Sequence, residues 1–163
     1  MRVPFMYYTY FQSPFCKLLI AGEDGILKQI DFLSSENSVP IPPPDWHLDD
    51  SPLKDAIHQL EAYFSGELKQ FSLEIALEGT PFQCLVWSAL QKTAYGSTIS
   101  YGELARLIGN PKACRAVGTA NARNPLPIIV PCHRVIGSNG KLVGFGGGLE
   151  LKQALLDHER RHC

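Results

Sequence analysis

The chain has 163 residues, a formal net charge of −1, 45% apolar residues and 19% charged residues. This composition is that of an ordinary globular protein, and the length suits one large domain or two small ones. The charge excludes a global basic field, so a nucleic-acid partner would have to meet a local basic surface. No stretch approaches the roughly 20 apolar residues that span a bilayer, and the N-terminus lacks the apolar core of a signal peptide.

The cysteines indicate the redox state of the protein. There are five, widely spaced, at positions Cys16, Cys84, Cys114, Cys132 and Cys163. An odd number without an export signal predicts reduced thiols in the cytoplasm. No Cys-x-x-Cys pair or zinc-finger spacing occurs, so we expect neither a metal nor a cofactor.

The first third of the chain is typical of β-structure. Apolar and aromatic residues predict strands over 7–12, 17–21 and 26–32, and turn residues at 22–25 join the last two as a hairpin. The proline-rich segment 39–44 fits neither a ladder nor a helix and predicts an extended connection.

A helix is expected next, with Ser51 as its N-cap and Pro52 at its first position. Its apolar face consists of Leu53, Ile57, Leu60 and Phe64, and Gly66 ends it. Residues 71–77 alternate between apolar and polar and predict a half-buried strand. The pattern changes near Gly79, which predicts an N-terminal domain over 1–78 and a C-terminal domain over 79–163.

The second half predicts short helices. Thr80 caps a helix that ends before Gly96, and Ser100 with Glu103 forms a capping box that opens another. Gly109 ends that helix and Asn110-Pro111 begins the next, which leaves a tight turn between them. Two short helices joined in this way indicate a helix-turn-helix.

The second of these helices has small side chains and nearby cations: Lys112, Ala113, Arg115, Ala116, Gly118 and Arg123. Small residues alone favour close packing between helices. The alternative is DNA contact, because a small-faced helix can approach the narrow minor groove and Arg115 could then enter the groove or the base stack.

A thiol and an imidazole are adjacent at Cys132-His133, after Pro131 and an apolar run over 128–130 that predicts a buried strand. A histidine near a thiol commonly lowers its pKa and makes it nucleophilic. Two other readings remain open. A free cysteine is usually a small buried hydrophobe. A cysteine hydrolase dyad is also possible, although neighbouring side chains on a strand point to opposite faces.

Two further polar residues could support such a thiol. Glu159, expected at the end of the last helix, could orient His133, but a solvated carboxylate is the favoured reading from the residue alone. Asn124 precedes a proline and is by itself a turn residue. A glycine-rich loop over 144–148 lies between these parts of the chain.

The stretch 124–135, with its Pro-Cys-His-Arg-Val core, closely resembles the active-site motif of the O6-alkylguanine-DNA alkyltransferases. The likeness extends from about Thr80 to Glu159, and the segment 13–22 resembles the family's N-terminal hairpin. The resemblance implies an α/β (α+β) protein. A ribonuclease-H-like N-terminal domain would precede a mostly helical C-terminal domain with a helix-turn-helix.

The resemblance also implies the reaction. O6-alkylguanine in double-stranded DNA, and O4-alkylthymine as well, would give its alkyl group irreversibly to Cys132 after the base is flipped out through the minor groove. The protein would act once, as a cytoplasmic monomer without an obligate protein partner or a membrane.

Roles are carried over by position. The reacting group would comprise Cys132 as acceptor, His133 as base through a water, Glu159 as the support of His133, and Asn124 as a brace. The base would be bound by Tyr101, by the carbonyls of Cys132 and Val135, and by a pocket wall of Pro127, Phe145 and Gly146, with the Gly146 amide donating to O6. DNA would be contacted by Lys112, Ala113, Arg115, Ala116, Gly118 and Arg123, with Arg115 filling the gap in the stack.

Departures from the family pattern carry expectations of their own. Phe145 and Gly146 stand where the human member has tyrosine and serine, so the pocket should be roomier and accept benzyl adducts. The N-terminal half lacks the human zinc ligands. The alternatives are an alkyltransferase-like protein that binds lesions without repair, a helix-turn-helix transcription factor, and a cysteine hydrolase.

Overall fold

The structure is a computed structural model that describes residues 5–33 and 41–163. The chain divides into two compact units, Met1–Ala76 and Leu77–Cys163. Each unit is described by itself.

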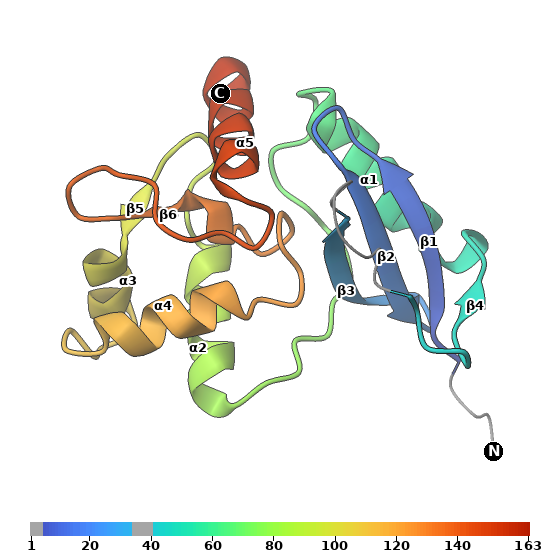
Figure 1. The fold of residues 1–163 in the computed structure, drawn as a ribbon, viewed down its shortest axis with the longest axis horizontal. Helices are drawn as coiled ribbons and strands as arrows, with labels where there is room; N and C mark the ends of the chain where they lie inside the picture. The colour runs from blue at the N-terminus through green and yellow to red at the C-terminus, as the bar shows by residue number, and fades with distance from the viewer. Residues whose placement is uncertain (1–4, 34–40) are drawn as a thin grey trace. The chain divides into compact units, whose positions relative to one another are not determined.

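The first unit is built on a four-stranded sheet in the order β3-β2-β1-β4 (Figure 1). Its strands are β1 (Tyr7–Gln12), β2 (Lys17–Glu23), β3 (Ile26–Leu33) and β4 (His47–Leu48). The first three pair antiparallel, whereas β4 runs parallel to β1. The three predicted strands and their hairpin are confirmed. Asp24 and Gly25 make the hairpin turn with φ of 52° and 79°.

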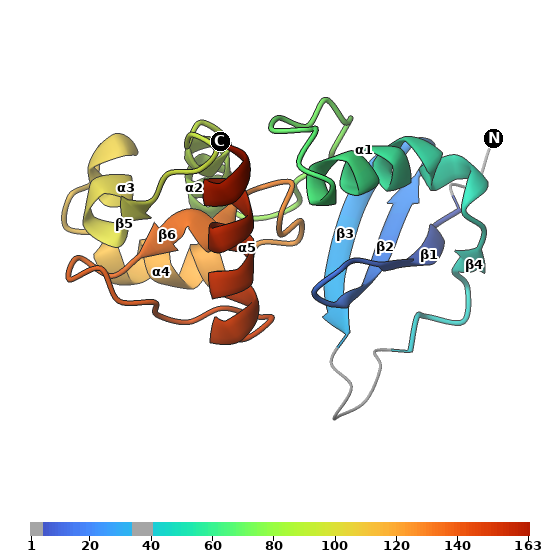
Figure 2. The same cartoon turned by 90° about the horizontal axis from the view of Figure 1, so that it is seen from above.

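One helix, α1 (Lys54–Phe64), covers one face of this sheet (Figure 2). The prediction of Ser51 as its N-cap is wrong, because a 3-10 turn, η1 (Ser51–Leu53), comes first and Asp50 precedes it. The Ser51 amide donates to Oδ1 of Asp49 at 2.9 Å, so Ser51 is already inside the turn. Gly66, with φ of 86°, follows the helix as expected.

Apolar side chains of the strands are buried on both faces of the sheet. Leu18 and Ile20 are fully buried, as are Leu60 and Tyr63 of the helix. Phe11, which pairs with Leu18 across the sheet, stacks on Phe64 at 6.1 Å between ring centroids. The other face carries a cluster consisting of Leu19, Ala21 and Leu33 with the partly buried Met6, Tyr8, Tyr10 and Trp46.

The strand predicted over 71–77 is wrong in extent. A single parallel bridge joins Ile75 to Leu27, with the Leu27 amide donating to Glu74 at 2.9 Å and the Ala76 amide donating to Leu27 at 3.0 Å. Alternation reports which side of a segment is buried, and this segment is half-buried without a continuous ladder. Residues 39 and 40 of the proline-rich segment lie outside the described residues, and 41–44 form no regular element.

The second unit is mostly helical (Figure 1). Its elements are α2 (Pro81–Gln91), β5 (Ile99–Ser100), α3 (Tyr101–Leu107), α4 (Cys114–Ala122), η2 (Cys132–Arg134), β6 (Val135–Ile136) and α5 (Leu149–His162). The capping boxes of α2 and α3, opened by Thr80 and Ser100, are both present. None of the helices in the described ranges has the length and apolar character needed to cross a membrane.

The pair α3 and α4 forms the predicted helix-turn-helix, but α4 begins later than expected. Asn110-Pro111 lies in a turn closed by the Ala113 amide, which donates to Asn110 at 3.0 Å. Lys112 and Ala113 therefore precede α4, which starts at Cys114. The indole of Trp87 donates to the Ala120 carbonyl at 2.8 Å and fixes α4 against α2.

Candidate active site

The segment before Cys132 is a buried loop, so the strand predicted over 128–130 is wrong. The Val130 amide donates to Leu126 at 2.8 Å, and the Cys132 amide donates to Val130 at 2.8 Å across Pro131. Pro131 has φ −81° and ψ 68°, an inverse γ-turn. Prolines at both ends of a three-residue run remove the donors that a ladder needs.

This loop also carries a strained residue. Ile128 has φ of 76° and is 1% exposed. A β-branched residue in this region costs about 1–3 kcal/mol and persists only where its surroundings impose it. Strain of this kind gathers at functional sites, and here it lies four residues before the thiol.

Cys132 begins the 3-10 turn η2 and is 5% exposed. Successive side chains on a 3-10 turn are about 120° apart, so the objection drawn from opposite strand faces does not hold for Cys132 and His133. The Cys132 carbonyl accepts from the Val135 amide and from Nδ2 of Asn121, the latter at 3.3 Å. The thiol-bearing backbone is thereby held from two sides.

Asn124 braces the same loop. Its Nδ2 donates to the Val130 carbonyl at 2.7 Å, and its Oδ1 accepts from the Leu126 amide at 2.9 Å. Asn124 is thus both a turn residue and a tie across the loop.

His133 lies against a buried carboxylate. Its Nε2 is 2.6 Å from Oε2 of Glu159, and both side chains are fully buried. The reading of Glu159 as a solvated group is therefore wrong. The helix also does not end there, because α5 continues to His162. Since Glu159 lies inside the last turns of α5, this helix sets its position relative to η2.

Arg134 completes this group by donating to Glu159 twice, from Nε at 2.8 Å and from Nη2 at 3.1 Å. Its Nη1 donates to the Thr93 carbonyl at 2.7 Å. Burial alone would raise the pKa of Glu159, but the hydrogen bond from His133 and the charge of Arg134 hold that pKa well below its usual range. Glu159 is therefore a carboxylate at every ordinary pH.

The imidazole of His133 is kept neutral. Burial lowers its pKa, and this outweighs the opposing influence of Glu159. When Nε2 donates to Glu159, the lone pair lies on Nδ1, which has no hydrogen-bond partner within residues 5–33 and 41–163. A neutral imidazole with one free lone pair can accept a proton.

The thiol itself is disfavoured as an anion by burial, which raises the pKa of Cys132 to about 11. A hydrogen bond with Asn124 and the charge of Lys152 act in the opposite direction and lower this pKa. The sequence predicts that His133 lowers the pKa of the Cys132 thiol, but His133 is not among the groups that lower it. Three residues that were not predicted as site residues also lie in this group: Asn121 holds the Cys132 carbonyl, Arg134 pairs with Glu159, and Lys152 lowers the pKa of Cys132.

A sequence signal existed for two of these three residues. Arg134 directly follows His133. Lys152 stands three, four and seven residues before Leu155, Leu156 and Glu159, which is the spacing of one helix face. A lysine on the buried face of a helix is rare, so its position in this pattern indicates a special role.

Tyr101, the first residue of α3, lies across from the glycine-rich loop. Its hydroxyl donates to the Val143 carbonyl at 3.2 Å. Burial, and next the nearby Cys132, raise the pKa of the Tyr101 phenol, so the hydroxyl keeps its proton at neutral pH. Gly118 of α4 lies beside the Tyr101 ring, where an added Cβ would be 3.8 Å from it.

The outer face of α4 presents small side chains with one arginine. Arg115 and Ala116 are exposed, whereas Val117 is buried. Lys112 and Arg123, before and after the helix, are exposed, and Ala113 is half-buried. Gly118 belongs to the side facing Tyr101 and not to this outer face.

The residues predicted to form the wall of the base pocket differ in their exposure to solvent. Pro127 and Val135 are buried, Phe145 is half-buried and Gly146 is exposed. No heavy atom outside its chain neighbours lies within 4 Å of a Cβ placed on Gly146, so this side of the loop is open.

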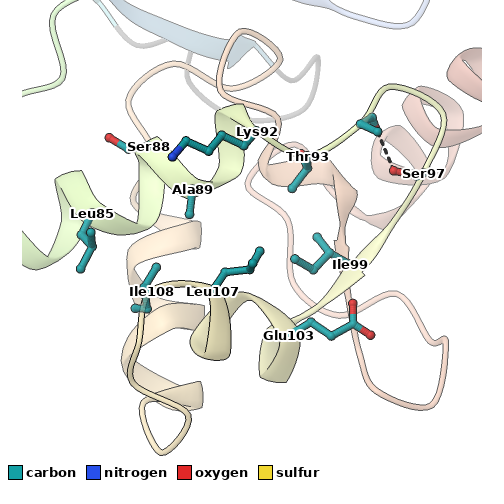
Figure 3. Close-up of a pocket in the computed structure, with 11 residues that line it drawn as sticks. Leu85, Ser88, Ala89, Lys92, Thr93, Ser97, Ile99, Glu103, Leu107 and Ile108 are labelled. Carbon is teal, nitrogen blue, oxygen red and sulfur yellow. Dashed lines mark hydrogen bonds between the residues drawn. The ribbon is translucent and has the colours of Figure 1, made fainter.

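A cavity of 420 Å³ lies elsewhere, between α2 and α3 (Figure 3). Apolar side chains from both helices, among them Leu85 and Leu107, line it. None of its lining residues belongs to the Cys132 group, so it is not the reacting site. Over residues 5–33 and 41–163, no group of three or more metal-ligating side chains is arranged to hold an ion.

Comparison with known proteins identifies the family. Residues 81–161 match the model of the 6-O-methylguanine DNA methyltransferase DNA-binding domain, and residues 6–77 match that of its ribonuclease-like domain. The chain belongs to the 6-O-methylguanine DNA methyltransferase family.

Relatives support this assignment over the full length. A methylated-DNA–protein-cysteine methyltransferase of Methanosarcina acetivorans is 51% identical over 154 residues, 94% of this chain and 98% of the relative. The crystal structure of the Mycobacterium tuberculosis O6-methylguanine methyltransferase superposes with a TM-score of 0.89 at 46% identity, covering 97% of this chain and 94% of the other. A complex of the M. tuberculosis protein with DNA gives a TM-score of 0.87. The predicted family and fold class are confirmed.

Proposed function

We propose that this protein repairs DNA by moving the alkyl group of O6-alkylguanine, and of O4-alkylthymine, onto the sulfur of Cys132. One observation carries the proposal. Asn121 and Asn124 hold the backbone that carries the buried thiol, and Cys132 lies next in sequence to an imidazole that a buried carboxylate orients. This is the arrangement of an activated nucleophile and its base.

The chemistry balances without a cofactor. A sulfur lone pair forms the new S–C bond while the C–O6 bond breaks and leaves its electrons on guanine. One proton moves overall from the thiol to the base, so the products are a thioether and neutral guanine. Because the thioether has no leaving group that water displaces readily, each molecule reacts once.

Three side chains divide the proton transfers. The lone pair on Nδ1 of His133 receives the thiol proton through a water, and Glu159 stabilises the imidazolium that forms. The Tyr101 hydroxyl, which lies near Cys132 and stays protonated, exchanges its bond to the Val143 carbonyl for one to the departing guanine.

The DNA is bound by the outer face of α4. Small residues beside Arg115 allow close approach to a minor groove, and a base must leave the stack before a buried thiol can reach it. Arg115 fills the resulting gap, and Lys112 and Arg123 contact the phosphates. We expect a monomer that binds double-stranded DNA and works in the cytoplasm, where a reactive thiol stays reduced.

The alternatives fit these residues less well. A lesion-binding protein without transfer has no use for a braced, buried thiol with its own base. A transcription factor reading the major groove needs large polar side chains on its recognition helix, whereas Ala116 and its neighbours are small. A cysteine hydrolase would turn over, whereas the proposed transfer stops after one equivalent, so the stoichiometry separates the two.

The proposal is tested by comparing two cysteine variants, C132S and C114S, on a duplex that carries one O6-methylguanine. Cys114 is an exposed free thiol and serves as the matched control. We expect C132S to lose transfer entirely while it binds the duplex as the wild type does, and C114S to keep its activity. Transfer by C132S, or its loss in C114S alone, would contradict the assignment.

A further inference from the structure

Lys152 in α5 is a fully buried lysine without a carboxylate partner. Its side chain has 0% exposure, and its ammonium donates to the Val143 carbonyl at 3.0 Å. Lysine is almost never fully buried unless its charge is paired. No carboxylate in the described part of the chain forms an ion pair with it, and a neutral carbonyl does not balance the charge.

The carboxylate of Glu159, which is also on α5, is already paired with Arg134 and His133. Glu159, two helical turns along the same face of α5, accepts two bonds from Arg134 and one contact from His133. Its single negative charge is thus balanced by the guanidinium. Lys152 is left as an excess positive charge in the interior of the second unit.

The group that can balance this charge lies on η2, against which α5 packs. Cys132 is the remaining buried group there that can become an anion. We propose that Lys152 is the counter-ion of the Cys132 thiolate, an inference that rests on the proposed role of Cys132 as the alkyl acceptor. With a thiolate whose proton has left to solvent, so that His133 stays neutral, the charges of Glu159, Arg134, Lys152 and Cys132 sum to zero.

The mutual electrostatics agree with this geometry. Burial lowers the pKa of Lys152, and the nearby sulfur of Cys132 raises it. In turn, Lys152 is among the groups that lower the pKa of Cys132 against its burial. The other titratable groups around the sulfur carry no positive charge that could balance a thiolate, because His133 is neutral and the Tyr101 phenol stays protonated.

The loop contact holds this cation in place. The Val143 carbonyl accepts from Lys152 and also from the Tyr101 hydroxyl, so one backbone atom joins α3, α5 and the glycine-rich loop. Lys152 therefore acts on the reaction through the sulfur, as an electrostatic support and not as a hydrogen-bond donor. When the S–C bond forms and the sulfur becomes a neutral thioether, the ammonium loses its counter-charge.

The test is the pH dependence of carbamidomethylation of Cys132 by iodoacetamide, followed on the Cys132 peptide by mass spectrometry. The variants are K152M and K152R, and the control is K92M at an exposed lysine that loses the same charge. We expect K152M to raise the apparent pKa of the thiol by about one unit, so that labelling at pH 7 falls about tenfold. K152R and K92M should stay within about twofold of the wild type.

The proposal fails if K152M slows labelling equally at every pH, because an unchanged apparent pKa would mean that Lys152 only supports packing. Should K152M not fold, the wild type gives the answer by NMR of the Lys152 side chain. Carbamidomethylation of Cys132 should lower the pKa of Lys152, and an unchanged value would overturn the proposal. Neither measurement uses DNA, so a failure of the repair function would appear separately, as absence of transfer from O6-methylguanine.

Discussion

Arg134 and Glu159 form a buried bidentate ion pair in which the guanidinium Nε lies 2.8 Å from Oε1 and Nη2 lies 3.1 Å from Oε2. Their side chains are 7% and 0% exposed. Burial is the main cause that lowers the pKa of His133, and this pair adds to it because the guanidinium charge disfavours an imidazolium. The base beside the thiol is therefore neutral before the reaction begins.

Replacing Arg134 by methionine should destabilise the protein by about 3–5 kcal/mol, because Glu159 is left as a buried charge without its guanidinium partner. The pKa of His133 should rise at the same time, since a nearby positive charge is removed. Denaturant unfolding and NMR titration of the imidazole measure the two effects. R160M, at a side chain that is 55% exposed, should change stability by less than about 0.5 kcal/mol. Equal stability of the two variants would show that the pair is not structural.

Stability should fall on acidification. The folded-state pKa values of His133 and Glu159 are both lowered, so the unfolded chain binds more protons than the folded protein in acid. The free energy of unfolding should thus decline below about pH 6.5 as His133 protonates in the unfolded chain, and more steeply below about pH 4.3 as Glu159 does. H133Q should remove the first decline and H58Q, at an exposed histidine, should leave it. A profile that is flat from pH 7 to 5 in the wild type would contradict the buried neutral imidazole.

Arg115 should matter for DNA but not for chemistry. In R115A, repair of a duplex should slow by about tenfold or more, which corresponds to about 1.4 kcal/mol, because the gap in the base stack is left unfilled. Reaction with free O6-benzylguanine should stay unchanged, since no base has to be extruded. R161A on α5 is the control. Equal slowing of both substrates in R115A would remove its assigned role.

Gly146 should set the size of adduct that the pocket accepts. We expect O6-benzylguanine to react faster with this protein than with the human member, which has serine at this place. The open space around Gly146 lets a serine fit without strain. G146S should therefore lower the benzyl rate several-fold relative to the methyl rate, with unchanged thermal stability. The prediction is wrong if the ratio of the two rates does not move.

Much of the fold followed from local patterns. Capping boxes at Thr80 and Ser100 involve only neighbouring residues, and alternation in β2 and β3 reports burial on two faces, so both were predictable from the sequence. The start of α4 at Cys114 and the single bridge at Ile75 depend on which partners the rest of the fold supplies. Such partners leave no periodic signal.

The candidate site shows the same division. The motif around Cys132 identified the family, and with it the pairing of His133 and Glu159 across 26 residues. Arg134 and Lys152 were not predicted as site residues because charged residues are usually solvated, whereas these two are buried in the fold. The prediction of a strand before Cys132 was wrong because an apolar run is typical of a strand, whereas the prolines at both ends of this run remove the donors that a ladder needs.

The most direct test of the central claim is the intact mass of the protein during titration with a duplex that carries one O6-methylguanine. The mass should rise by one CH2 group per molecule and stop at one equivalent of DNA, and the added group should lie on the Cys132 peptide. Release of unmodified protein with lesion binding but no mass gain would contradict alkyl transfer. A gain on another cysteine would contradict the assignment of Cys132.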